Sequence, residues 1–284
     1  MSDTDNTARR MWTLYEPYHA VVYFAPQVDA ALKEAGYKGF WMGYFAARLA
    51  PIGAVGPELG AAVCFGFEPA MVTRSLPDAW RFAPPVAALD ARLAGVGAVL
   101  DELGVTDDDD IAEAAELAVR AAASIDRAGR VLGAANAALP VPDSPRLALW
   151  QATTTLREHR GDGHVAALTA SGVGACPTQV LAVAAGSQRQ LLQPSRGWSD
   201  DDWSAALSEL FGRGWLAADG TITSTGREVH GEIEARTDAS AAGPWRTLGT
   251  ARTARLAALL TPLAERIAGR VVPYPNPIGV PPPS

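Results

Sequence analysis

One seven-residue segment of the sequence, Glu-His-Arg-Gly-Asp-Gly-His, concentrates side chains that can carry chemistry. It holds two of the chain's four histidines together with two carboxylates and an arginine. Histidine beside carboxylate suits proton transfer or the binding of a divalent metal, and arginine suits an anionic group. We expect a site here whose catalytic or ligand groups are Glu158, His159, Asp162 and His164, with Arg160 as an anion clamp.

These side chains converge only if the backbone bends. His159 and His164 are five positions apart, which places them on different faces of a regular helix. A break at Gly161 or Gly163 would bring them together, because glycine adopts backbone conformations that other residues avoid. The alternative is a structural polar helix end, in which these groups pair with one another or with backbone carbonyl groups.

A second pair of candidate ligands lies near the N-terminus. Glu16 and His19 are three positions apart and share one helix face, which is a metal-ligand spacing in helical bundles. If this helix meets the segment above, a divalent metal would be held by Glu16, His19, His159 and His164. The alternative for His19, which stands among aromatic residues, is an ordinary hydrogen-bonded place in the core.

Aromatic residues and an arginine mark a candidate ligand surface. Trp41, Tyr44 and Arg48 recur along a predicted helix over residues 40–49, and Tyr18 lies on the first helix. Arg48 suits an acidic ligand, although a cation near the end of a helix also interacts favourably with the helix dipole. The same stripe is typical of core packing, so both interpretations stay open.

Composition and missing motifs exclude several classes of function. Apolar residues make up 48% of the chain, and the net charge of −7 gives no general attraction to the phosphates of nucleic acids. The chain lacks G-x-x-x-x-G-K-[ST], G-x-G-x-x-G, G-x-S-x-G and H-E-x-x-H, so ATP, dinucleotide and familiar hydrolase chemistry are unsupported. A polar N-terminus and the lack of an apolar run of ~18 residues predict a cytoplasmic protein with no membrane partner.

The elements that must position these residues are mostly helices. Three prolines near residue 140 form a stiff connector, and we place a domain boundary there. The predicted parts are an N-terminal helical unit (1–140), a C-terminal unit (141–270) and an extended proline-rich tail (271–284).

The C-terminal unit shows the element order of a winged helix. Ser199, with Asp202 three residues later, is a helix start of the capping-box type. Two short extended runs around an Asp-Gly pair predict one small β-hairpin wing at residues 214–223. Thr225 then starts the next helix. The fold class predicted from these elements is mainly α.

The two halves of the chain repeat a similar order of signals. Each half has a glycine stop, an apolar helix, a helix that starts at proline or serine, and a late helix that contains arginine and leucine. This order predicts duplicated winged-helix-like units, of which the first has lost its wing. The protein would then be a monomer that is an intramolecular pseudo-dimer, or a homodimer. Chance similarity between helical proteins is the alternative.

Four segments carry a resemblance to a known family. They are the run Phe40–Arg48, the run Leu156–Ala166, Arg196-Gly197-Trp198-Ser199 and Tyr274-Pro275-Asn276-Pro277. Through them the chain resembles an actinobacterial helix-turn-helix family with a winged-helix fold, distantly similar to MarR-type regulators. The resemblance covers nearly the whole chain. It implies a fold more than an activity, because such a scaffold does not by itself imply DNA binding.

The leading hypothesis is a cytoplasmic small-molecule-binding protein, with or without catalysis, that uses His, Glu, Asp and Arg groups on a winged-helix scaffold. The alternatives are a MarR-like DNA-binding transcriptional regulator and a purely structural interaction protein.

In a winged-helix protein, the helix before the wing normally enters the major groove of DNA. Here that helix has a formal charge of −3, from Asp200, Asp201, Asp202 and Glu209 against Arg213. Phosphates repel such a helix, so we expect no tight binding of nucleic acid.

Overall fold

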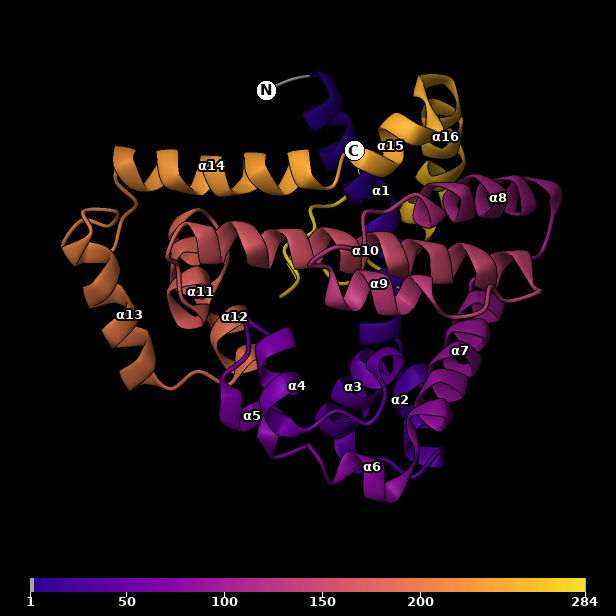
Figure 1. Cartoon of the computed structure of the whole chain (residues 1–284), viewed down its shortest axis with the longest axis horizontal. Helices are drawn as coiled ribbons and strands as arrows, with labels where there is room; N and C mark the ends of the chain where they lie inside the picture. The colour runs from indigo at the N-terminus through magenta and orange to yellow at the C-terminus, as the bar shows by residue number, and fades with distance from the viewer. Residues whose placement is uncertain (1–2, 284) are drawn as a thin grey trace.

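The computed structural model describes residues 3–283, which fold mainly into helices joined by short turns (Figure 1). In chain order the helices are α1 (Asp3–Phe24), α2 (Pro26–Glu34), α3 (Gly39–Leu49), η1 (Ala50–Ile52), α4 (Pro57–Val63), α5 (Pro69–Thr73), α6 (Ala79–Phe82), α7 (Pro85–Glu102), α8 (Asp109–Ala123), α9 (Val131–Ala137), α10 (Pro145–Ala170), α11 (Ala175–Ala184), α12 (Arg189–Arg196), α13 (Asp200–Gly212), α14 (Ser224–Ser240), α15 (Gly243–Leu248) and α16 (Thr250–Ile267). The expected mainly α class is confirmed.

Two helix starts follow directly from local side-chain chemistry. The Asp108 carboxylate accepts a hydrogen bond from the backbone N–H of Ile111 at 2.9 Å and so caps α8. Ser199 and Asp202 form the expected capping box at the start of α13. In both places a side chain satisfies amide groups that the first turn of a helix leaves free.

The expected β-hairpin at residues 214–223 does not form strands. Its arms meet in a single antiparallel bridge between Leu216 and Ile222, and residues 3–283 contain no β-sheet. Thr223, rather than Thr225, caps α14, because its hydroxyl accepts a hydrogen bond from the N–H of Gly226 at 3.0 Å. Helix α14 therefore begins at Ser224, one residue before the predicted cap and directly after the expected hairpin.

Two apolar cores share the long helix α10. The larger core joins residues between 8 and 156 to residues between 241 and 280, and the smaller core lies between 167 and 233. Helix α1 packs against α10, α14 and α16, so both predicted units contribute to the larger core. Their independence as domains, and the duplication, stay predictions.

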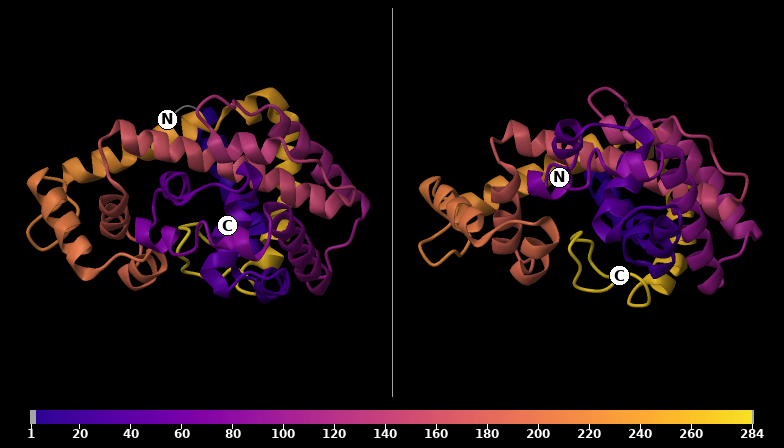
Figure 2. Two further views of the ribbon diagram at one scale, coloured as in Figure 1. Left: turned by 60° about the horizontal axis from the view of Figure 1, so that its bottom comes forward. Right: turned by 90° about the horizontal axis from the view of Figure 1, so that it is seen from below.

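The smaller core supports the helices at one end of the molecule. It holds Val180 of α11, Leu210 of α13 and Ile233 of α14. Helix α14 runs alongside α10 and also contacts α1, so both α10 and α14 connect this end to the larger core. Figure 2 shows α13 at the same end, away from α7.

The break expected within α10 is absent. The helix runs without interruption through Gly161 and Gly163. Gly163 is needed for a close approach instead, because a side-chain carbon there would overlap the guanidinium group of Arg130 and the hydroxyl of Ser240. The glycine that suggested a bend thus allows another part of the chain to lie against a straight helix.

The C-terminal tail packs against the body of the protein. Val272 and Val280 are buried, and the Asn276 amide donates hydrogen bonds to the carbonyl oxygens of Pro273 at 3.1 Å and Val280 at 3.0 Å.

Within residues 3–283, no single helix has the length and apolar composition that a membrane span requires. Only α10 and α11, taken together as a bent pair, meet those criteria.

Candidate functional site

A buried ion-pair cluster lies where α1, α3 and α10 meet. Glu158, only 2% exposed, accepts two hydrogen bonds from Arg48, at 3.1 and 3.2 Å, and one from Arg157 at 3.0 Å. Burial alone would raise the pKa of Glu158, but Arg157 and Arg48 more than offset it and hold the pKa at about 2. The carboxylate is therefore ionised at neutral pH. Arg48 and Glu158, two separately predicted site residues, are direct partners.

His19 lies beside this cluster as a neutral imidazole. Its Nδ1 is 2.9 Å from the hydroxyl oxygen of Thr154, and its Nε2 is 3.0 Å from that of Tyr23. Thr154 donates its one proton to the carbonyl oxygen of Trp150 at 2.9 Å, so Nδ1–H must donate to Thr154 and Nε2 must accept from Tyr23. Burial, with Arg157 nearby, holds the pKa of His19 well below its usual value.

Arg92 of α7 is a buried arginine without a carboxylate partner. It is 4% exposed and donates hydrogen bonds to neutral oxygens of Ala47 at 2.9 Å, Asn136 at 3.2 Å and Gln151 at 3.4 Å. Within residues 3–283, no carboxylate oxygen lies within 4.0 Å of its guanidinium group. Burial lowers the pKa of Arg92 to about 10, so it is still charged at neutral pH.

A narrow pocket leads from the surface to these groups. Its lining combines the half-exposed Phe40 with the buried Arg92 and Glu158 and with Arg48, whose side chain is 13% exposed. Apolar and aromatic side chains form the walls between them, among them Val22, Tyr23, Val28, Leu32 and Tyr44. The free volume inside the pocket is about 30 Å³, which holds very few water molecules. We call this the narrow pocket.

A wider cleft lies on the other side of Arg157, between α1, α10, α14 and the tail. Its volume is about 470 Å³, and its lining includes three of the predicted residues, Glu16, Arg160 and His164. Arg160 pairs with Asp238 at 2.7 Å. His164 donates from Nδ1 to the Thr237 hydroxyl at 3.0 Å, since that hydroxyl gives its proton to the backbone of α14.

Two predicted residues of α10 face α9 instead. His159 is 2% exposed, its Nε2 has no hydrogen-bond partner within residues 3–283, and burial lowers its pKa to about 4. Asp162 accepts a hydrogen bond from the N–H of Gly133 at 2.8 Å, and burial raises its pKa to about 6. Their roles in binding or catalysis stay predictions.

The expected convergence of the histidines is not found. His19 lies at the narrow pocket, His164 at the cleft and His159 against α9. In the part of the chain that the structure describes, no three His, Cys, Asp or Glu side chains are arranged to hold a metal ion, so Glu16 and the three histidines do not form the expected metal site. The physical reason is the unbroken α10, which turns successive side chains by about 100° per residue.

The aromatic candidates divide between pocket and core. Tyr44 lines the narrow pocket, with its ring centroid 5.3 Å from that of Tyr23. Trp41 packs against Tyr44 and Phe67, at centroid distances of 5.6 and 6.0 Å, in an aromatic cluster behind the wall. Tyr18 is fully buried, and its hydroxyl donates to the carbonyl oxygen of Arg146 at 3.1 Å.

Sequence reasoning missed Arg92 as a pocket residue. One signal was present, since Arg92 stands four positions after Ala88 and four before Val96, both fully buried on the same face of α7. An arginine on an apolar helix face must find buried partners or a ligand. This sequence pattern alone would have identified Arg92 as a candidate site residue.

Comparison with known proteins identifies one similarity. A model of a family described as a helix-turn-helix family matches residues 8–273. The comparison with curated proteins and the comparison with solved structures gave no match.

Proposed function

The chain belongs to this helix-turn-helix family, and on that scaffold we propose that it is a small-molecule-binding protein whose ligand enters the narrow pocket. The observation that carries the proposal is the pocket's construction. Apolar walls lead from a half-exposed aromatic residue, Phe40, to convergent charged groups, which is the lining that ligand sites have. Its free volume of about 30 Å³ is smaller than that of such sites, so a ligand must displace wall side chains to enter.

The cost of the charged end supports a functional role. Desolvating Arg48, Arg92 and Glu158 is unfavourable, and apolar side chains of similar volume often stabilise a fold as well or better. Titratable groups perturbed by burial and by specific charges gather at functional sites more often than elsewhere. The shifted pKa values of Glu158 and Arg92 fit that expectation.

A blocked pocket tests this proposal. Val22 lines the wall, so Val22→Trp should fill the passage, whereas Val131→Trp adds the same bulk at an exposed position outside the pocket. We would measure melting temperatures of both variants and the unmodified protein against acids, amides, alcohols and amines of six to ten carbons. We expect compounds that raise the melting temperature of the unmodified protein and of Val131→Trp, but not of Val22→Trp. If no compound separates the two variants, the assignment of this pocket fails.

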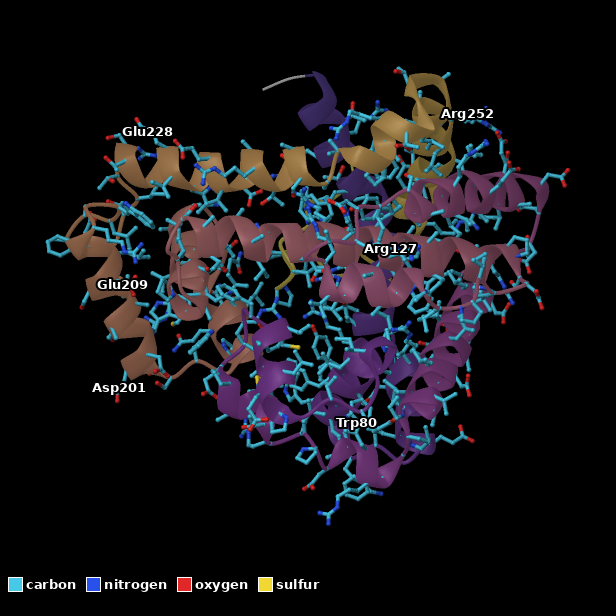
Figure 3. The ribbon with its side chains drawn as sticks, viewed as in Figure 1. Trp80, Arg127, Asp201, Glu209, Glu228 and Arg252 are labelled. Carbon is cyan, nitrogen blue, oxygen red and sulfur yellow. The ribbon has the colours of Figure 1, made fainter. Side chains whose placement is uncertain are left out.

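A DNA-binding regulator is the second candidate, because helix-turn-helix proteins commonly read DNA. Helices α11 to α14 would form a winged-helix, MarR-like unit with α13 as the recognition helix. The charge of α13 opposes this role. Asp201 and Glu209 project from it, and Arg213 pairs with Glu209 at 2.8 Å (Figure 3).

Gel-shift titration with genomic fragments at low salt decides between the candidates. We expect no sub-micromolar binding, because an acidic helix repels the phosphate backbone. Binding below one micromolar that weakens steeply with salt would favour the regulator.

A further inference from the structure

We propose that the narrow pocket takes a monocarboxylate with a slim apolar body, whose carboxylate reaches Arg92 and Arg48 at the closed end. This inference rests on the proposed function and adds the charge and shape of the ligand. Three observations carry it: an excess of buried positive charge, the neutral partners of Arg92, and the narrowness of the passage.

The closed end holds more arginines than carboxylates. Arg48 and Arg157 share Glu158, and Arg157 also contacts Glu16 from the side of the cleft at 3.4 Å. Arg92 is left with neutral acceptors only. These three arginines exceed the two carboxylates by one charge, and the remaining carboxylate of the pocket lining, Asp29, pairs with Lys33 at 2.5 Å. Arg92 also lies over the ring of Trp150, 5.4 Å from its centroid, but no opposite charge neutralises it. An anion that enters the pocket would therefore gain electrostatic stabilisation from Arg92.

Because the excess is one positive charge, it favours a ligand whose head group carries one negative charge. A monocarboxylate supplies one negative charge, whereas a dianionic phosphate would leave a new uncompensated charge in the same place. The planar carboxylate also matches the fork of a guanidinium group. His19 adds no charge, because its imidazole is neutral.

The walls select a slim body. Val22, Val28 and Leu32 contribute apolar surface, and the rings of Tyr23 and Tyr44 pack directly against each other in the wall, with their centroids 5.3 Å apart. The small free volume leaves no place for a bulky ring system. An unbranched alkyl chain needs the least displacement of these side chains. Phe40, 45% exposed, lines the pocket near the surface and packs against Trp41 and Tyr44 at centroid distances of 5.0 and 6.2 Å.

Octanoate and octanamide provide a matched pair of probes, because they share a body and differ in the charge of the head. We would measure both by titration calorimetry on the full chain at pH 7. We expect octanoate to bind at least tenfold more tightly than octanamide. Arg92→Gln should remove that preference, whereas Arg81→Gln, at a side chain that is 81% exposed, should keep it. Val22→Trp should abolish binding of both probes.

The outcomes separate the two proposals. If both probes bind the unmodified protein equally and Val22→Trp abolishes both, the pocket binds ligands but the carboxylate assignment is overturned. If neither probe binds, or if binding ignores Val22→Trp, both this inference and the assignment of the pocket are overturned. The comparison of acid with amide needs no substitution, so it stands even if Arg92→Gln does not fold.

Discussion

Replacing Glu158 with glutamine removes the charge at the centre of the buried cluster and keeps the shape of the side chain. Arg48 and Arg157 then lose their common carboxylate, while their own side chains are only 13% and 17% exposed to solvent. Removing one partner of a buried ion pair typically costs about 3–5 kcal/mol, because the remaining charge stays buried. Glu158→Gln should therefore be strongly destabilising.

The pKa of Glu158 gives an independent magnitude. Its pKa is about 2 in the folded protein, against an ordinary value of 4.5. Each unit corresponds to about 1.4 kcal/mol, so ionised Glu158 stabilises the fold by about 3 kcal/mol at neutral pH. Because the folded pKa is the lower one, this stabilisation is complete above pH 4.5 and is lost as the pH falls towards 2. The two routes agree on about 3 kcal/mol.

Urea unfolding at pH 7, followed by tryptophan fluorescence, measures the effect. We expect Glu158→Gln to lower the free energy of unfolding by about 3 kcal/mol. Glu113→Gln is the control, since Glu113 pairs with Arg255 at the surface and should change stability far less. At pH 3 the difference between Glu158→Gln and the unmodified protein should shrink. A loss below about 1 kcal/mol at pH 7 would refute the reasoning, because surface pairs already reach that value.

Two further changes test the helix that carries the site and the one at the far end. The pKa of His159 is about 4 in the folded protein, against an ordinary value of 6.5. The neutral imidazole therefore contributes its full stabilisation above pH 6.5, and the free energy of unfolding should fall by up to about 3 kcal/mol as the pH falls to 4. His159→Gln should flatten the pH dependence of urea unfolding in that range, and an unchanged slope would contradict this. Ser199→Ala should cost about 1 kcal/mol by removing the α13 cap, and an unchanged melting temperature would show that the cap is dispensable.

Local signals in the sequence predicted the helices and several of their starts. A cap acts over three residues, as at Ser199 and Asp108, and helix periodicity acts over four, so both can be recognised without knowing the fold. The acidic character of α13 is equally visible from composition. Arg48 and Glu158 were chosen for their side-chain chemistry, and the structure pairs them.

The position of Thr223 shows where local reasoning failed. Thr225 was the expected cap, because Glu228 stands three residues after it, and Thr223 was expected in the second arm of the hairpin. The structure starts α14 at Ser224, and its wing is reduced to a single bridge.

Only the tertiary structure decided where the side chains of α10 point and which partners they meet. Gly163 suggested a bend, but the helix is unbroken, and Arg130, from another segment, fills the space beside the glycine. Arg160 pairs with Asp238, on a helix far along the chain, rather than with its neighbour Asp162. Such contacts join residues distant in sequence, and their energies depend on burial that no local pattern encodes. The site therefore divides into a narrow pocket and a cleft, on two sides of Arg157.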